Sequence, residues 1–216
     1  MEFIKMHGIG NDYVFVDCFR QEAPADPARA AIAVSKPHVG IGADGLILML
    51  PDAECDARMR IFNADGSEGE MCGNGIRCMG KYLYDSGLVR SERMTIRTGG
   101  GVRTLEVVTE GGAAVGARVD MGAPEFDPAK IPVNAPENRV VVLFPDGRTA
   151  RFTCVGMGNP HAVTFSRFVT GEELSRQGSQ VERAPQFPER TNVEFCRADE
   201  DGVHVSVWER GSGATL

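Results

Sequence analysis

Alternating apolar and polar positions dominate this chain and predict a protein built mainly of β-strands. A strand such as residues 58–62 alternates Met59 and Ile61 with arginines, the period of a sheet with one buried face. Similar alternating runs, or runs of β-branched residues, recur along the whole sequence. We predict strands at 2–6, 13–18, 46–50, 58–62, 94–97, 102–109, 114–120, 139–144, 149–155, 161–166, 192–196 and 203–208.

Helical patterns are fewer, and each is marked by a start signal or a stop signal. Residues 75–86 place Ile76, Met79 and Leu83 on one helical face, and Gly87 follows as a stop. Two further helices are expected. One follows the N-cap and proline pair at 26–27 and runs to about residue 35, and the other starts from the capping-box spacing at 170–173 and ends toward Gly178.

An internal repeat predicts two similar domains. Residues 6–15 resemble residues 155–163, with Gly8 aligned to Gly156 at an offset of 148, and both segments have Gly-x-Gly-Asn, a ring side chain and then a strand. A second match pairs residues 60–67 with 206–212. Four prolines between residues 121 and 138 suit a connection between domains. We therefore expect domains at 1–120 and 121–216.

Composition excludes several classes of function. The 23 basic and 30 acidic residues give a net charge of −7 without a basic cluster, which argues against a nucleic-acid partner. No apolar run approaches the roughly 18 residues of a membrane span, and the start is not a signal peptide. We therefore expect a cytoplasmic protein whose six cysteines are thiols. Scattered histidines, the lack of C-x-x-C and the lack of nucleotide-binding loops indicate no metal and no cofactor.

Cys72 carries the strongest chemical signal, because it stands at the start of the 75–86 helix in Met71-Cys72-Gly73-Asn74-Gly75. A helix N-terminus favours a thiolate, and the unpaired N–H groups of Gly73 and Asn74 offer a seat for a carboxylate. This pairing suggests proton transfer at the carbon that bears the carboxylate. The alternative is that Cys72 is a structural cysteine in the core, because cysteines outside disulfides are usually buried.

Six segments of the chain give it a resemblance to the diaminopimelate epimerases, cofactor-independent amino-acid epimerases of lysine and peptidoglycan biosynthesis. The asparagine after Cys72-Gly73 points to this branch, since proline-racemase-like relatives more often carry histidine there. The resemblance implies an α+β fold of two pseudo-symmetric domains, each a curved, mostly antiparallel sheet around a central helix. The matching segments are residues 5–13, 40–45, 62–67, 71–78, 157–161 and 208–213.

The same resemblance implies roles for individual residues. Cys72 would be one of two acid/base cysteines, and Gly73 and Asn74 would bind the carboxylate at the reacting carbon. His161 and Glu209 would act as polar groups near the reacting amino group, Glu209 also contacting substrate. Residues implied to hold the distal end of the substrate are Asn11, Asn63, Asn159, Asn192 and Arg210. From the residues alone, these asparagines could be turn formers, His161 a core imidazole and Glu209-Arg210 a solvated pair.

The implied reaction interconverts LL- and meso-diaminopimelate with two thiols across an interdomain cleft, in a homodimer. The second cysteine would directly follow Leu216, so the second domain is expected to be incomplete. We predict that the 216-residue chain does not invert its substrate by the two-base route. Two alternatives remain: another cofactor-free racemase or epimerase of the same fold, acting on proline or hydroxyproline, and a non-catalytic binding protein with an inert Cys72.

Overall fold

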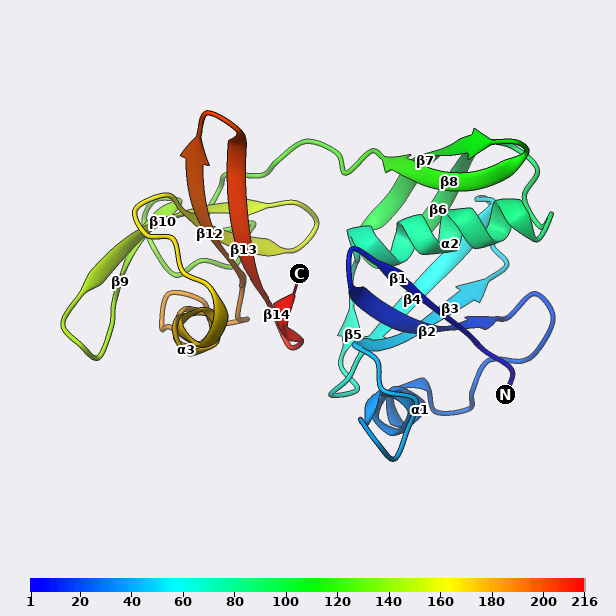
Figure 1. Ribbon diagram of the computed structural model, residues 1–216, viewed down its shortest axis with the longest axis horizontal. Helices are drawn as coiled ribbons and strands as arrows, with labels where there is room; N and C mark the ends of the chain where they lie inside the picture. Colours follow the sequence, from blue (N-terminus) through cyan, green and yellow to red (C-terminus); the bar gives the residue numbers. More distant parts are fainter. Residues whose placement is uncertain (216) are drawn as a thin grey trace. The chain divides into compact units, whose positions relative to one another are not determined.

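Eight strands of the first unit, Met1–Gly122, form one curved sheet in the computed structural model, which describes residues 1–215 (Figure 1). The sheet order is β1-β2-β3-β4-β6-β7-β8, with β5 paired to β4. Pairing is antiparallel except for β2 with β3 and β4 with β6. The strands are β1 (Ile4–Gly8), β2 (Asn11–Asp17), β3 (Gly45–Leu50), β4 (Ala57–Asn63), β5 (Glu68–Gly69), β6 (Arg93–Thr98), β7 (Gly101–Glu110) and β8 (Ala113–Val119).

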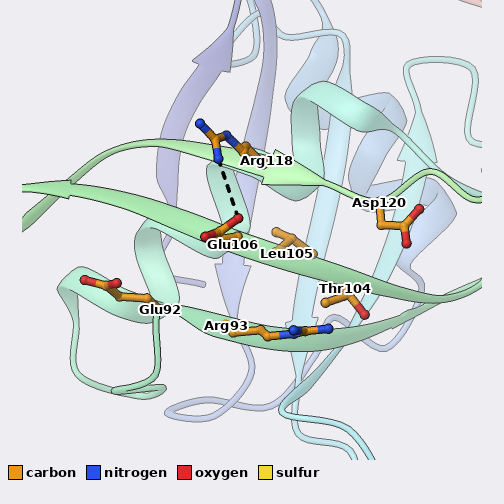
Figure 2. Close-up of a pocket in the computed structure, with 7 residues that line it drawn as sticks. All are labelled: Glu92, Arg93, Thr104, Leu105, Glu106, Arg118 and Asp120. Atoms are coloured by element: carbon orange, nitrogen blue, oxygen red, sulfur yellow. Dashed lines mark ion pairs between the residues drawn. The ribbon is translucent and has the colours of Figure 1, made fainter.

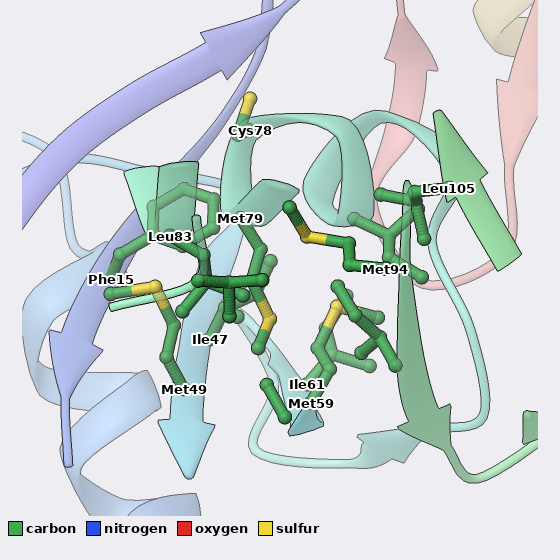
Figure 3. Packing of buried hydrophobic residues seen from close by; sticks show 14 of the residues in the cluster. Phe15, Ile47, Met49, Met59, Ile61, Cys78, Met79, Leu83, Met94 and Leu105 are labelled. Carbon is green, nitrogen blue, oxygen red and sulfur yellow. The ribbon is translucent and has the colours of Figure 1, made fainter. Parts of the chain in front are cut away.

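Two helices cover the two faces of this sheet. The α2 helix (Gly73–Asp85) buries Ile76, Met79 and Leu83, the face that the sequence predicts, against Phe15 and Ile47 and their neighbours (Figure 3). The α1 helix (Pro27–Ser35) packs on the opposite face, where strand residues such as Val14 and Leu48 form a second core. Successive side chains of a strand point to opposite faces, so these central strands are apolar on both.

The second unit begins at Ala123, two residues beyond the predicted boundary. Its described strands form a six-stranded sheet in the order β14-β13-β12-β11-β10-β9, antiparallel except for β11 with β12. The α3 helix (Gly171–Glu182) packs on one face, over a core that includes Phe152 and Phe195. The strands are β9 (Arg139–Leu143), β10 (Thr149–Gly156), β11 (Pro160–Thr164), β12 (Asn192–Asp199), β13 (Gly202–Glu209) and β14 (Gly213–Thr215).

The sequence repeat corresponds to a repeat of topology. In the first unit an antiparallel β1–β2 pair leads through α1 to the parallel strand β3 and then to antiparallel β4 and β5. In the second unit β10–β11, α3, β12, β13 and β14 follow in the same order with the same directions. By this correspondence α3 matches α1. The second acid/base cysteine that the resemblance implies falls outside the described residues and stays a prediction.

Most predicted elements are confirmed, and the α+β class with mostly antiparallel sheets is correct. Each predicted strand range overlaps an observed strand, while β5 and β14 were missed because they span only two and three residues. The stop predicted at Gly178 is wrong, since α3 continues to Glu182. A Cβ at Gly178 would lie 2.5 Å from Cβ and Cγ of Trp208, so this glycine serves close packing inside the helix.

The capping box predicted at the start of α3 is also wrong in its contacts. Thr170 is the N-cap residue, but its side chain makes no capping hydrogen bond. The Glu173 carboxylate instead accepts hydrogen bonds from Arg167 and Gln177. The position of the helix start was therefore predicted correctly, and the hydrogen bonds that fix it were not.

Candidate active site

Cys72 is the N-cap residue of α2, and its extended backbone turns the side chain back over the first turn of the helix. Its Sγ accepts a hydrogen bond from the Gly75 N–H at 3.4 Å. The thiol also lies 3.5 Å from the Asn11 Oδ1, to which it can donate. The side chain is half-buried, so a substrate can reach a sulfur that backbone dipoles already surround.

The amide of Asn11 is held in one orientation by Asp44. Asn11 Nδ2 donates to Asp44 Oδ2 at 2.7 Å, and the same oxygen accepts from the Asp12 N–H at 2.9 Å. Because the NH₂ group faces this carboxylate, Oδ1 of Asn11 faces Cys72. Asn11 is also almost fully buried, so a neighbour, and not solvent, fixes its rotamer. Sequence reasoning assigned no role to Asp44, although it lies in the matching segment 40–45.

The first turn of α2 brings Gly73 and Asn74 beside the sulfur. Asn74 Nδ2 donates to Asn11 Oδ1 at 3.4 Å, and Arg77 donates to Asn74 Oδ1 at 2.5 Å and to the Gly73 carbonyl at 3.1 Å. The backbone N–H groups at such a helix start have no intrahelical acceptor. A Cβ at Gly8 would lie 3.1 Å from Asn74 Cβ, so the β1–β2 turn approaches this helix end closely. The arrangement provides N–H donors for an anion next to Cys72.

The described hydrogen bonds of Asn63 lie within the turn from β4 to β5. It ends β4, and its Nδ2 donates to Ser67 Oγ at 3.0 Å within the turn to β5. The backbone N–H of Asn63 donates to the Ser67 carbonyl at 2.9 Å. These contacts match the turn-former interpretation of Asn63, and its role toward substrate stays a prediction.

The second unit brings Asn159 and His161 together with a residue that sequence reasoning missed, Glu194. The His161 Nε2 lies 2.8 Å from Asn159 Oδ1, and its Nδ1 lies 2.6 Å from Glu194 Oε1. His161 is partly exposed, with a side-chain accessibility of 25%, against 13% for Glu194. A signal for Glu194 was available, because it alternates with Asn192 along β12 and so shares its face of the sheet.

Asn192 and Arg210 are joined directly. The Asn192 Oδ1 accepts from the Arg210 backbone N–H at 2.9 Å, while its Nδ2 donates to the Pro160 carbonyl at 3.0 Å. The Arg210 guanidinium reaches the Glu189 carbonyl at 3.4 Å. Asn192 is buried and therefore links the start of β11 to the loop that carries Arg210. Next to that loop, Glu209 accepts a hydrogen bond from the Thr215 hydroxyl at 3.4 Å.

A buried carboxylate under this loop was also missed. Glu182, at the end of α3, is 2% exposed and accepts from Trp208 Nε1 at 2.9 Å and from the Gly211 N–H at 3.3 Å. Arg190 lies 3.7 Å from the same side chain. Glu182 thus holds both ends of the segment that contains Glu209 and Arg210. No sequence pattern predicts that Glu182 is buried, because a charged residue at a helix end is ordinarily exposed.

Buried cysteines outside the Cys72 site have raised pKa values, which favour the neutral thiol. Burial raises the pKa of Cys154 to about 11 and also raises the pKa of Cys196, with Glu194 adding to the second shift. Burial raises the pKa of Cys78 more than nearby Arg77 lowers it. The six cysteines are thiols and not disulfide-bonded. Across residues 1–215 no group of three His, Cys, Asp or Glu side chains could hold a metal ion, and no helix is long and apolar enough to cross a bilayer.

A shallow hollow of about 390 Å³ lies on the β6–β7–β8 part of the first sheet, away from the predicted site residues (Figure 2). Its lining mixes charges of both signs, and the Arg118–Glu106 pair across it spans 3.8 Å with both side chains mostly exposed. Such a pair contributes little binding energy. None of the predicted acid/base or substrate residues lines the hollow, so it is not the candidate active site.

Comparison with known proteins decides between the alternatives that the residues leave open. The family model for diaminopimelate epimerase matches residues 3–126 and 153–216. The diaminopimelate epimerases of Acetivibrio thermocellus and Desulfovibrio desulfuricans are 45% and 47% identical to the chain, in alignments that cover all of it and 78% of each relative. The chain belongs to the diaminopimelate epimerase family. It is an isomerase of the epimerase class, and the predicted family is confirmed.

Solved structures support the fold of this diaminopimelate epimerase family member. A hydroxyproline epimerase from Agrobacterium vitis has a TM-score of 0.71 and 16% identity, over 99% of this chain and 71% of that chain. At this identity the likeness shows a shared fold alone. The proline-racemase-like alternative therefore rests on fold, whereas the diaminopimelate assignment rests on identities near 45% over the whole chain.

Proposed function

We propose that Cys72 exchanges the α-proton of diaminopimelate, as one of the two acid/base groups that invert this centre. The observation that carries the proposal is the position of Sγ. It lies at the N-terminus of α2, between the Gly75 N–H and the oriented amide of Asn11. The Gly75 N–H and the dipole of α2 stabilise the thiolate, the form that removes a proton, while Asn11 Oδ1 accepts from the neutral thiol. As Cys72 takes the proton, the carbon develops negative charge that must be stabilised.

The helix start supplies that stabilisation. We assign the substrate α-carboxylate to the backbone N–H groups of Gly73 and Asn74, where the dipole of α2 favours an anion. When the α-proton leaves, charge spreads into this carboxylate. Donors already aimed at its oxygens then bind the transition state more strongly than the ground state. The hydrogen bonds of Asn11 with Asp44 and Cys72 hold the sulfur in a fixed position beside these N–H groups.

The distal end of the substrate is assigned to an arginine and to several asparagines. Diaminopimelate carries a second amino-acid group, and Arg210 suits its carboxylate because a guanidinium can donate two parallel hydrogen bonds. We assign the accompanying polar contacts to Asn11, Asn63, Asn159 and Asn192. His161 and Glu209 are assigned to the surroundings of the reacting amino group. Support comes from the hydrogen bonds that join Asn192 to Arg210 and Asn159 to His161.

Proton exchange in deuterated water tests the proposal. We expect the chain to incorporate deuterium at the α-carbon of diaminopimelate, and Cys72→Ala to remove this activity. Cys55→Ala, at another half-buried thiol of the same unit, is the matched control and should exchange normally. Exchange that survives in Cys72→Ala would refute the role of Cys72. Faster exchange on proline than on diaminopimelate would refute the substrate, and full inversion by the 216-residue chain would refute the need for a second thiol.

Pathway, assembly and location complete the proposed function. We infer a role in lysine and peptidoglycan-precursor biosynthesis from the family. We also infer a homodimer in the cytoplasm, with neither nucleic acid nor membrane as partner. Six cysteines outside any disulfide suit a reducing compartment, and a net charge of −7 without a basic cluster suits a small-molecule enzyme. Light scattering and cell fractionation test the last two inferences.

A further inference from the structure

His161 and Glu194 face each other from neighbouring parallel strands. On β11 and β12, His161 is in register with Asn192 and Val163 with Glu194. Because side chains alternate along a strand, His161, Asn192 and Glu194 share one face of the sheet. The other face carries Val193 and Phe195, which belong to the apolar core. The pairing of histidine with glutamate therefore lies on the polar face that also presents the predicted substrate residues.

The contact between these two side chains fixes where the imidazole carries its proton. Nδ1 of His161 lies 2.6 Å from Glu194 Oε1. An ionised carboxylate can only accept hydrogen bonds, so the nitrogen that faces it must be the protonated one. Which ring nitrogen is protonated in a neutral histidine is set by such a partner. The proton of the neutral ring is thus held on Nδ1, and Nε2 is the nitrogen left to take up or release a proton.

The surroundings of Glu194 do not suggest that its carboxylate stabilises the fold. Its side chain is 13% exposed, and Oε2 is buried with no hydrogen-bond partner among the described residues. A carboxylate in such surroundings costs free energy unless it is well paired, so a position of this kind is a poor choice for stability alone. Its one described hydrogen bond is directed at His161.

The other ring nitrogen, Nε2, faces the amide of Asn159, which can hydrogen-bond to Nε2 whether or not this nitrogen carries a proton. Asn159 Oδ1 lies 2.8 Å from His161 Nε2. The amide oxygen accepts from a protonated Nε2, and after a flip the amide NH₂ donates to a bare Nε2. Nε2 therefore keeps a hydrogen-bond partner in either orientation of the amide, while Nδ1 stays bonded to Glu194.

We propose that Glu194 is a positioning residue for the epimerase reaction, which holds the proton of His161 on Nδ1 and so reserves Nε2 for the substrate side. Its effect on turnover rests on the proposed function, because only that proposal places His161 near the reacting amino group. The state of the ring does not depend on the proposed function and can be measured separately.

Nitrogen NMR of the imidazole tests the state of the ring without any substrate. The ¹⁵N-labelled chain contains four histidines, and His161→Gln assigns the signals of this one. We expect the Nδ1–H tautomer in the wild type and loss of this preference in Glu194→Ala and Glu194→Gln. Glu200→Gln, at an exposed position in the same unit, is the matched control and should leave the ring unchanged. An Nε2–H tautomer in the wild type would overturn the proposal even if the variants do not fold.

Deuterium exchange on diaminopimelate tests the consequence. We expect Glu194→Gln to slow kcat for exchange by about 10–100-fold, less than the roughly 100–10,000-fold that the acid or base itself contributes, while KM changes less. A correct tautomer with unchanged kcat in Glu194→Gln would overturn the positioning role and leave the proposed function intact. A wild type that shows the tautomer and exchanges nothing would instead refute the proposed function.

Discussion

Trp208 Nε1 donates a 2.9 Å hydrogen bond to Glu182 Oε2, joining the end of β13 to the end of α3. The other carboxylate oxygen accepts from the Gly211 N–H. The ring of Trp208 lies on Gly178 of the same helix, where no Cβ would fit. A single carboxylate therefore fixes the two sides of the short segment that carries Glu209 and Arg210.

Replacing this carboxylate should destabilise the second unit. Glu182→Ala leaves two N–H donors without their acceptor, at a cost of about 1–3 kcal/mol for each buried group. Glu182→Gln keeps one acceptor oxygen and should cost less. Trp208 is the only tryptophan, so its fluorescence reports this region during urea unfolding. Glu137→Gln, at an exposed position, is the control, and a Glu182→Ala midpoint equal to the wild type would contradict the expectation.

Cys72 should react with iodoacetamide faster than the buried thiols. It is half-buried at a helix start, while burial raises the pKa of Cys154 and Cys196 and hides their sulfurs. Burial and nearby Asp17 also raise the pKa of Cys18. Peptide mass spectrometry after short labelling at pH 7.5 measures the order of reaction. Equal rates at Cys72 and Cys196 in the folded chain would favour an inert Cys72.

Asp44→Asn should impair exchange while leaving the fold in place. An asparagine at position 44 can both donate and accept, so the NH₂ group of Asn11 is no longer required to face it. The Oδ1 of Asn11 is then no longer held toward Cys72. Small displacements of reacting groups can reduce rates by about 100-fold, and we expect a loss of about 10–100-fold. Thermal unfolding of the variant checks the fold. Asp120→Asn, an exposed position in the same unit, should exchange at the wild-type rate.

Cys154 should make the second unit less stable at high pH. Its side chain is fully buried and its folded pKa is about 11, above the ordinary value of 9.0. A group whose pKa is raised by folding contributes its stability below pH 9 and loses it as pH rises through 11. The free energy of unfolding should fall by about 2 kcal/mol over this range. Cys154→Ala should flatten the fall and Cys55→Ala should not, and equal slopes would contradict the assignment.

Sequence patterns predicted most of the fold because the elements carry their own periodicity. Alternation placed the long strands, and Ile76, Met79 and Leu83 form the buried face of α2 as expected. The failures have local causes. Strands β5 and β14 are too short to show a period, and the stop predicted at Gly178 overlooked a glycine that serves contact with Trp208, 30 positions away in sequence.

The candidate site was predicted less completely. Cys72, Gly73 and Asn74 lie together at one helix start, as the motif predicts, whereas the contacts of Asn11 with Cys72 and Asn74 were not predicted. The supporting carboxylates were missed, because their partners come from distant elements. Asp44 acts through Asn11, and Glu182 through Trp208 and Gly211, over separations that no local pattern encodes. Among these carboxylates, only Glu194 could have been found from the sequence, because it alternates with Asn192 along β12.

Every ladder of hydrogen bonds described for the strands joins partners from the same half of the chain, β1 to β8 or β9 to β14. During synthesis, domains generally fold in the order in which they emerge from the ribosome. Once residue 122 has left the exit tunnel, all partners of the β1–β8 sheet are present, and Cys72 can take its place on α2 before β9 has emerged.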